Sequence, residues 1–180
     1  PKAREELALG LKELGMMEFP KVTLEYSSNE LHQKIAQVVQ EQWKKGLGID
    51  VDIQKHEHKI LLDRLVHRSY DLATVWWFAQ YKDPMSILER FMYKKNGKNY
   101  PDWENPSYVR LLEKSAYMTS VEKRSKMLAQ AESILLDEMP LTPLYHWKTS
   151  FMMKEHITIK DLDPQGAFDY CRITFDSTKP

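Results

Sequence analysis

Two histidines flank a glutamate at 56–58, the place where potential metal ligands come closest together in this sequence. On an extended segment, residues two apart point to the same side, so the imidazoles of His56 and His58 would face one way. Zinc needs a third protein ligand and usually a fourth. The other histidines, which show no ligand spacing, are His32, His67, His146 and His156. We therefore predict no metal ion and interpret 56–58 as a solvated strand end.

Sequence signatures of catalysis and of cofactor binding are missing. There is no Gly-x-Ser-x-Gly nucleophile turn, no Gly-x-Gly-x-x-Gly dinucleotide loop, no phosphate-binding Gly-rich loop and no His-Glu-x-x-His. The single cysteine, Cys171, cannot form an internal disulfide and is interpreted as a small buried apolar residue. We predict no catalytic residue and no cofactor.

An aromatic cluster at 76–78, followed by Tyr81, is the most informative feature. On a strand, Trp76 and Phe78 would face one way and fill the core, whereas Trp77 would face the other way. Trp77 would then lie near the carboxyl end of a parallel strand, where ligands bind in open α/β sheets. Gln80 and Tyr81, in the turn that follows, offer hydrogen-bonding groups there.

Composition narrows the class of protein. The chain has 180 residues with 26 basic and 26 acidic side chains, so it lacks the positive charge that a nucleic-acid binder uses against phosphates. Hydrophobic residues make up 42%, enough for a sizeable core, and the length suits one domain. No initiator methionine or signal peptide opens the chain, so we expect a piece of a longer protein that lacks its targeting segment.

Hydrophobic periodicity predicts an α/β fold. Strands are expected at 22–26, 49–53 and 72–78, the last nearly continuous in apolar residues, and helices at 2–14, 29–46 and 57–68. Capping boxes, Ser27 with Glu30 and Thr119 with Glu122, would begin two of the helices. Strand, helix and strand in succession predict parallel pairing with right-handed crossovers, hence a mostly parallel sheet with flanking helices.

The second half of the chain is predicted to be mainly helical. A short helix follows Asp83 and Pro84, and 94–105 is an exposed loop that carries Tyr100 and Trp103. Two helices follow, with Val109, Leu112 and Ala116 facing inward on the first. The prolines at 140 and 143 leave 141–147 extended or at a sheet edge, and a last strand is expected at 168–175.

The order of these motifs resembles the C-terminal lobe of the oligopeptide- and dipeptide-binding proteins of ABC transporters, the family-five extracellular solute-binding proteins. The resemblance covers about residues 1–175. The motifs that carry it are Ile-Ala-Gln-Val-Val-Gln-Glu-Gln-Trp-Lys-Lys-Gly-Leu-Gly-Ile-Asp-Val (35–51), Tyr-Asp-Leu-Ala (70–73), Trp-Trp-Phe-Ala-Gln-Tyr-Lys-Asp-Pro (76–84), Asn-Pro-Ser-Tyr (105–108) and the run 124–145.

The resemblance implies a lobe similar to periplasmic binding proteins of type II and a function as the substrate-binding component of a peptide transporter. An extended peptide would be enclosed between this lobe and an N-terminal lobe, and a membrane permease would receive it. Such proteins are periplasmic or otherwise extracytoplasmic, and some are lipid-anchored. The residues that the resemblance places at the ligand are Trp77, Phe78, Ala79, Gln80, Tyr81, His146 and Trp147.

Two positions depart from the oligopeptide-binding pattern. That pattern has an aspartate that pairs with the free α-amino group of the peptide, where this chain has Gln80. A neutral amide cannot supply this ion pair, which argues against peptides with a free amino terminus as ligands. Thr74 replaces a basic residue of the oligopeptide binders and changes the charge of the pocket again.

We therefore interpret residues 1–180 as a single domain, the C-terminal lobe of a two-lobe solute-binding protein, and not as an enzyme. Two alternatives stay open. The ligand could be an amino-blocked or modified peptide, a nickel complex or a sugar, all of which occur among relatives. Alternatively, the chain could be a small metal-dependent hydrolase that uses His56, His58 and carboxylates.

Overall fold

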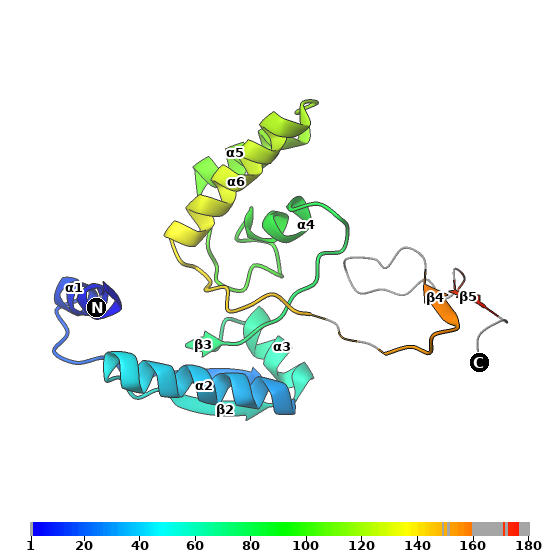
Figure 1. Ribbon diagram of the computed structural model, residues 1–180. Helices are drawn as coiled ribbons and strands as arrows, with labels where there is room; N and C mark the ends of the chain where they lie inside the picture. The colour runs from blue at the N-terminus through cyan, green and yellow to red at the C-terminus, as the bar shows by residue number, and fades with distance from the viewer. Residues whose placement is uncertain (1, 149, 151, 160–170, 172, 177–180) are drawn as a thin grey trace. The chain divides into compact units, whose positions relative to one another are not determined.

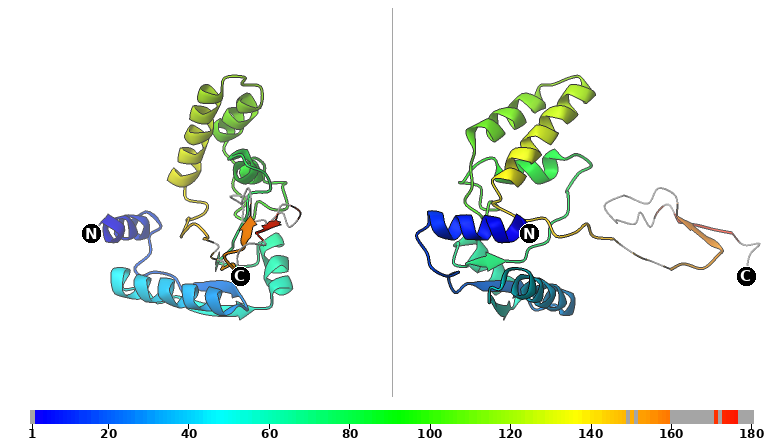
Figure 2. Two further views of the ribbon diagram at one scale, coloured as in Figure 1. Left: turned by 45° about the vertical axis from the view of Figure 1, so that its right-hand side comes forward. Right: turned by 60° about the vertical axis from the view of Figure 1, so that its left-hand side comes forward.

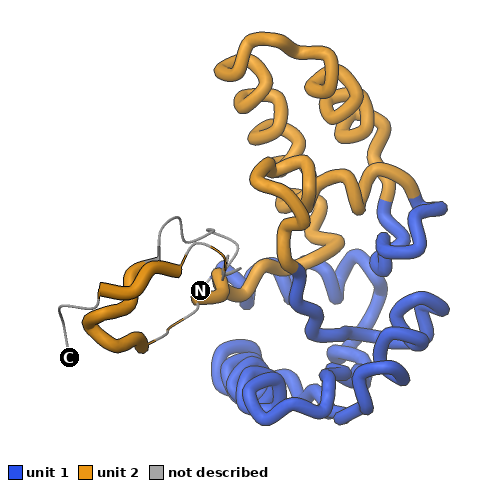
Figure 3. The backbone as a smooth tube through the Cα atoms, turned by 90° about the vertical axis from the view of Figure 1, so that its right-hand side faces the viewer, with its two compact units in different colours: residues 1–77, 94–103 blue, residues 78–93, 104–180 orange. Residues whose placement is uncertain are grey.

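The computed structural model describes residues 2–148, 150, 152–159, 171 and 173–176. Its contacts divide the chain into two units, which are described separately below (Figure 3). Unit 1 comprises Pro1–Trp77 and Lys94–Trp103, and unit 2 comprises Phe78–Tyr93 and Glu104–Pro180. Within the described part of the chain, no helix has the length and apolar character needed to cross a membrane.

Unit 1 contains a parallel sheet of three strands (Figure 1). The strands are β1 (Thr23–Ser27), β2 (Asp52–His56) and β3 (Leu72–Ala73), in the order β2-β1-β3. Leu24 of β1 is aligned with Ile53 of β2 on one side and with Leu72 of β3 on the other. The predicted parallel sheet is confirmed, and β1 is its central strand.

Three helices belong to this unit: α1 (Lys2–Glu13), α2 (Glu30–Leu47) and α3 (His58–Val66). Helix α2 begins after Asn29, whose side-chain oxygen accepts a hydrogen bond from the Leu31 amide at 2.9 Å. The predicted cap at Ser27 is therefore wrong, because Ser27 is still the last residue of β1. Gly48 ends α2 with a left-handed φ of 75°, a conformation that costs glycine least.

The two crossover helices pack on opposite faces of β1. Helix α2 lies over β2 in Figure 1 and packs on the face of the sheet that carries Leu24 and Tyr26. Helix α3 contacts β1 from the other face, where its Arg64 reaches Glu25. This arrangement is expected because the chain steps from β1 to β2 and then back past β1 to β3 with crossovers of one hand.

The apolar core of unit 1 lies between α2 and the sheet. Its buried members are Leu24, Tyr26, Ala36 and Val51, each at most 5% exposed. Partly buried hydrophobic residues that pack against them are Phe19, Val22, Val39, Trp43, Ile49, Ile53 and Leu72. The alternation that predicted the strands therefore marks the face that α2 covers.

The opposite face of β1 is also buried, although alternating apolar and polar residues are typical of a strand with one buried face. Glu25 is only 2% exposed, and both of its carboxylate oxygens accept hydrogen bonds from Arg64, at 2.6 Å each. Nε2 of His56 lies 3.1 Å from the same carboxylate, and the His56 side chain is 11% exposed. A buried carboxylate needs such partners, so Glu25 is polar without being solvated.

Strand β3 is much shorter than predicted. Only Leu72 and Ala73 form it, and the Thr74 amide adds one more hydrogen bond to the Glu25 carbonyl, at 2.9 Å. Trp76 and Phe78 are 49% and 48% exposed, so their predicted place in the core is wrong. Beyond Thr74 the chain leaves β1, and these rings therefore have no facing strand to pack them into the core.

Unit 2 is built around two neighbouring helices, α5 (Pro106–Ala116) and α6 (Val121–Asp137) (Figures 1 and 2). A short helix, α4 (Met85–Leu88), and a 3-10 turn, Glu89–Phe91, precede them as predicted. Asn105 caps α5, because its side-chain oxygen accepts hydrogen bonds from the backbone N–H groups of Ser107 and Tyr108. Ser120, not Thr119, caps α6.

Apolar packing joins α4, α5 and α6. The buried residues of this core are Leu88, Phe91, Tyr108, Leu112, Leu128, Ala131 and Leu135. The hydroxyl of Tyr108 donates to the Leu88 carbonyl at 2.7 Å, and burial raises the pKa of this phenol. Leu112 of α5 is buried as predicted, whereas Ser115 is buried in place of the exposed Ala116, and Tyr108 in place of the half-buried Val109.

The end of the chain has little regular structure in its described part. Residues 142–148 form no strand and are exposed. Strand β4 (Ile157–Ile159) pairs antiparallel with β5 (Ile173–Phe175), which overlaps the predicted strand at 168–175. Half of that predicted strand, including Tyr170, lies outside the described residues. Cys171 is exposed rather than buried as predicted.

Replacing Glu25 with glutamine should destabilise unit 1 by about 1.5–3 kcal/mol, because Arg64 would lose its charged partner in a buried site. The matched control is Glu30→Gln, which removes an exposed pair with Lys34 in helix α2 and should cost no more than about 0.5 kcal/mol. Urea unfolding followed by circular dichroism measures both. Equal losses in the two variants would contradict this assignment of Glu25.

Candidate functional site

The segment 74–81 leaves the carboxyl end of β3 and carries most of the predicted ligand-binding residues. The boundary between the two units falls between Trp77 and Phe78. In unit 1, the ring of Trp76 stacks on the imidazole of His58 with a centroid distance of 6.3 Å and an interplanar angle of 17°. Nζ of Lys98 lies 5.3 Å from the ring centroid of Trp77, a cation–π contact.

Three histidines occupy the ends of the elements at this edge of the sheet. His56 ends β2, His58 begins α3, and His32 lies in the first turn of α2. Burial and the nearby His58 lower the pKa of His32. His56 faces Glu25 and is largely buried, so its prediction as a solvated strand end is wrong. Because α3 begins at His58, the strand alternation that would aim both imidazoles one way does not continue.

No metal centre emerges from the groups that the structure describes. Within those residues, no cluster of three or more histidine, cysteine, aspartate or glutamate side chains has a metal-binding arrangement. His56 contacts a carboxylate that Arg64 already binds through both oxygens. The arrangement of this site is one of ring faces and hydrogen-bonding groups, which suits binding of a solute.

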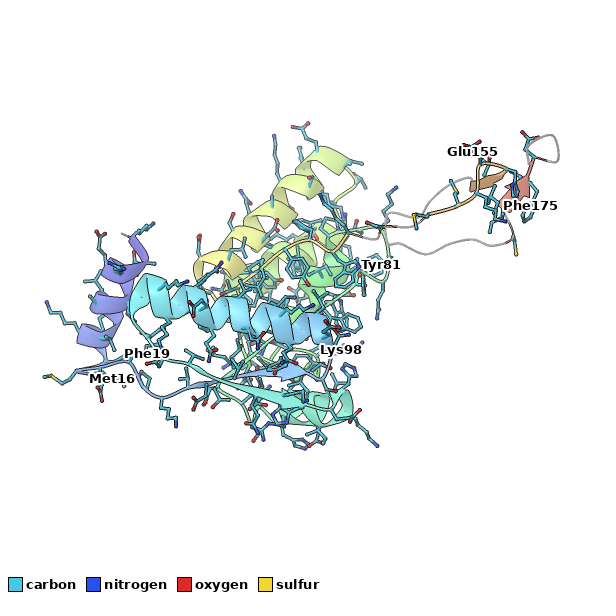
Figure 4. All side chains as sticks on the ribbon, turned by 60° about the horizontal axis from the view of Figure 1, so that its bottom comes forward. Met16, Phe19, Tyr81, Lys98, Glu155 and Phe175 are labelled. Atoms are coloured by element: carbon cyan, nitrogen blue, oxygen red, sulfur yellow. The ribbon has the colours of Figure 1, made fainter. Side chains whose placement is uncertain are left out.

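In unit 2, the residues after Trp77 form an exposed strip that is anchored through its backbone. Phe78 and Tyr81 are 48% and 42% exposed, and the Gln80 side chain is also exposed. Figure 4 shows the Tyr81 side chain on this segment. The backbone N–H of Gln80 donates to Oγ of Ser86 at 2.7 Å. Partial burial and neighbouring Glu89 raise the pKa of Tyr81.

An ion pair fixes the turn that follows. Asp83 accepts two hydrogen bonds from Arg124 of α6, at 2.6 and 3.0 Å, and a third from the Met85 amide at 2.9 Å. The guanidinium holds the pKa of the Asp83 carboxyl below its usual range. Sequence reasoning identified Asp83 only as the start of a helix, because Arg124 lies 41 residues further along the chain.

The loop 94–103 of unit 1 is more ordered by its own contacts than its polar composition predicted. Asn99 is 1% exposed and donates to the Trp103 carbonyl at 2.7 Å. Arg68 pairs with Asp102 at 2.8 Å and donates to the Lys94 carbonyl at 3.0 Å. Tyr100 and Trp103 are half-buried rather than exposed.

His146 and Trp147 are the remaining predicted site residues. Both are exposed, and the Trp147 ring lies 6.4 Å from that of Tyr145. They lie in the extended part of unit 2 after α6. The side chains of His146 and Trp147 are therefore accessible, and their position at the ligand stays a prediction.

Comparisons with known proteins identify relatives over nearly the whole chain. The profile of the family described as bacterial extracellular solute-binding proteins, family 5 Middle, matches residues 1–99. The chain is 39% identical to the oligopeptide-binding protein OppA of Bacillus subtilis over 158 residues, 86% of this chain and 29% of that protein. It is 32% identical to the periplasmic murein peptide-binding protein MppA of Escherichia coli, over 74% of this chain and 25% of that protein.

A solved structure agrees with these relatives. Haemophilus influenzae OppA in complex with RPPGFSPFR superposes with a TM-score of 0.82 at 27% identity, covering 97% of this chain and 35% of that chain. This likeness confirms the predicted α/β fold of the type II binding-protein lobe. The chain spans between a quarter and about a third of the length of the proteins it matches.

Truncating Trp76 to alanine should cost no more than about 2 kcal/mol of stability, since about half of the ring is already exposed. The control is Leu65→Ala in helix α3, where the side chain is 1% exposed and truncation should cost about 2–5 kcal/mol. Urea unfolding of both variants measures the difference. A loss for Trp76→Ala as large as that for Leu65→Ala would restore the core assignment of this ring.

Proposed function

This chain belongs to the bacterial extracellular solute-binding proteins of family 5, and from that premise we propose that it is the C-terminal lobe of a peptide-binding component of an ABC transporter. All of residues 1–180 would belong to this lobe. An N-terminal lobe would supply the other wall of the ligand site. The bound peptide would be delivered to a membrane permease from the periplasmic or extracytoplasmic side, and a lipid anchor is one means of attachment there.

The observation that carries this proposal is the exposure of the aromatic side chains that follow β3 in the sequence. Trp76 in unit 1, and Phe78 and Tyr81 in unit 2, each leave between 42% and 49% of their surface open. The segment that carries them follows the carboxyl end of a parallel strand. Ligands of open α/β sheets bind at that edge. Large exposed rings offer contact area to side chains of many sizes, which suits a binder of varied peptides.

The proposed residues share the work in two ways. The rings of Trp77, Phe78 and Tyr81, and that of Trp147, would pack against peptide side chains. The side-chain amide of Gln80, the backbone of Ala79 and the imidazole of His146 would exchange hydrogen bonds with the peptide backbone or its ends. Binding without turnover fits this set, since nothing in it pairs a nucleophile with a base.

The amide at residue 80 favours ligands whose amino end carries no unpaired charge. An ammonium brought into a closed cleft needs a carboxylate partner to offset its desolvation. Gln80 cannot be that partner, and amino-blocked or modified peptides would not require one. Such peptides are therefore the proposed ligand class.

The two-lobe protein that contains this chain should bind peptides far more tightly than this chain alone, because one lobe supplies only part of the contact area. A pool of random pentapeptides, each N-acetylated so that its amino end is blocked, is titrated into each in a calorimeter. The same two-lobe sample, examined as purified by native mass spectrometry, should carry peptide-like solutes. Equal affinities of the chain and the two-lobe protein, a tightly bound metal ion, or turnover of the peptides would contradict the proposal.

Gln80→Asp should raise the affinity of the two-lobe protein for peptides with a free amino terminus by about tenfold to a hundredfold, the effect of a charge-assisted hydrogen bond. The gain should vanish for the N-acetylated peptide of identical sequence. It should also weaken as the pH falls through the pKa of the new carboxyl, since only the ionised form pairs with the ammonium.

The matched control for this substitution is Gln42→Asp, at another exposed glutamine, on helix α2. Calorimetric titration compares both variants with the free and the acetylated peptide. Equal responses of Gln80→Asp to the two peptides would show that residue 80 does not face the amino end of the ligand.

A further inference from the structure

Three hydrogen bonds from backbone N–H groups hold the turn that carries Gln80 and Tyr81. The amide of Gln80 donates to Oγ of Ser86, the amide of Asp83 donates to the Tyr81 carbonyl at 2.8 Å, and the amide of Ser86 donates to the Asp83 carbonyl at 3.0 Å. The Asp83 carboxylate adds the bond from Met85. Residues 80–86 therefore form a closed turn whose polar groups point at one another.

Two side chains connect this turn to the body of unit 2. Ser86 is 3% exposed, so its hydroxyl is fixed in the core beneath Gln80. Arg124 comes from the first turn of α6, a helix of 17 residues, and binds Asp83 through two nitrogens. The paired side chains of Asp83 and Arg124 are each 28% exposed, and a two-pronged guanidinium–carboxylate pair fixes orientation as well as distance.

We infer that Ser86 and Arg124 are positioning residues that hold Gln80 and Tyr81 ready for the ligand before it binds; this inference rests on the proposed function. Neither residue needs to touch the ligand. Ser86 fixes the backbone of Gln80, and Arg124 fixes Asp83, to which the Tyr81 carbonyl is bonded.

The physical reason is the entropy of ordering a turn. Fixing the backbone of a residue costs conformational entropy, and a turn that is loose in the free protein would take that cost from the binding free energy. The buried Ser86 hydroxyl and the ion pair of Asp83 with Arg124 order the turn when the protein folds, so binding does not have to order it. The exposed side chains of Gln80 and Tyr81 can then contact a ligand without further ordering of the chain beneath them.

The test uses Ser86→Ala and Arg124→Met in the two-lobe protein. Each should weaken binding of the N-acetylated random pentapeptide pool by about tenfold, the equivalent of ordering roughly one residue again. Each should also speed hydrogen exchange of the Gln80 and Asp83 amides in the ligand-free protein. Arg124→Lys should recover only part of the affinity, since an ammonium cannot bind both oxygens in a fixed plane.

The matched control is Ser115→Ala. Ser115 is also a buried serine of unit 2, and its hydroxyl donates to the Leu112 carbonyl at 2.8 Å inside α5. This variant should lose a comparable amount of stability without loss of affinity. The double variant Ser86→Ala/Arg124→Met should lose less affinity than the sum of the single losses, because both act on one turn, whereas Ser86→Ala and Ser115→Ala should add.

Unchanged affinity and unchanged exchange in Ser86→Ala and Arg124→Met would overturn the inference, as would affinity losses that Ser115→Ala shares. Where Ser86→Ala does not fold, the comparison of Arg124→Met with Arg124→Lys decides. Failure of the unsubstituted two-lobe protein to bind any peptide of the pool would count against the proposed function itself. The exchange rates of Gln80 and Asp83 then decide by themselves whether the two side chains order the turn.

Discussion

The central strand β1 is the constraint on which unit 1 depends. It pairs in parallel with a neighbour on each side, and parallel strands are stable when both of their faces are covered. Helix α2 covers one face with apolar contacts, whereas α3 covers the other around the ion pair of Glu25 and Arg64. Both helices begin after the carboxyl ends of strands. The same constraint therefore gathers His32, His58 and the first residues after β3 at one edge of the sheet.

In unit 2 the proposed ligand residues are positioned by hydrogen bonds and an ion pair, and not by a strand. The strip from Phe78 to Tyr81 has no strand beneath it, and its order comes from hydrogen bonds to Ser86 and from the contact of Asp83 with helix α6. A loop of this kind presents side chains freely while its backbone is held. Binding proteins that accept ligands of varied sequence gain from this combination, since adaptable pockets still need a fixed frame.

Hydrophobic periodicity predicted the elements of the fold well, because amphipathic helices and alternating strands reflect which face is buried. It failed where burial is polar or depends on distant residues. The alternation around Glu25 is typical of a residue on the solvent side of a strand. The neighbouring sequence gives no sign of the ion pair with Arg64, which is 39 residues away. The apolar run at 74–78 looked like a core strand, yet Trp76 and Phe78 are exposed because β3 ends at Ala73. The proposed site was predicted from family resemblance, whereas its supports at Ser86 and Arg124 needed the structure.

The most direct test of the central claim, that the segment after β3 contacts a peptide, is the indole N–H signal of each tryptophan in a nuclear magnetic resonance titration of the two-lobe protein. Signals are assigned by single Trp→Phe substitutions, and a peptide pool is the titrant. The signals of Trp77 and Trp147 should shift on saturation, and that of Trp43, which packs against the core of unit 1, should not. Shifts confined to other tryptophans, with Trp77 unmoved, would contradict the account.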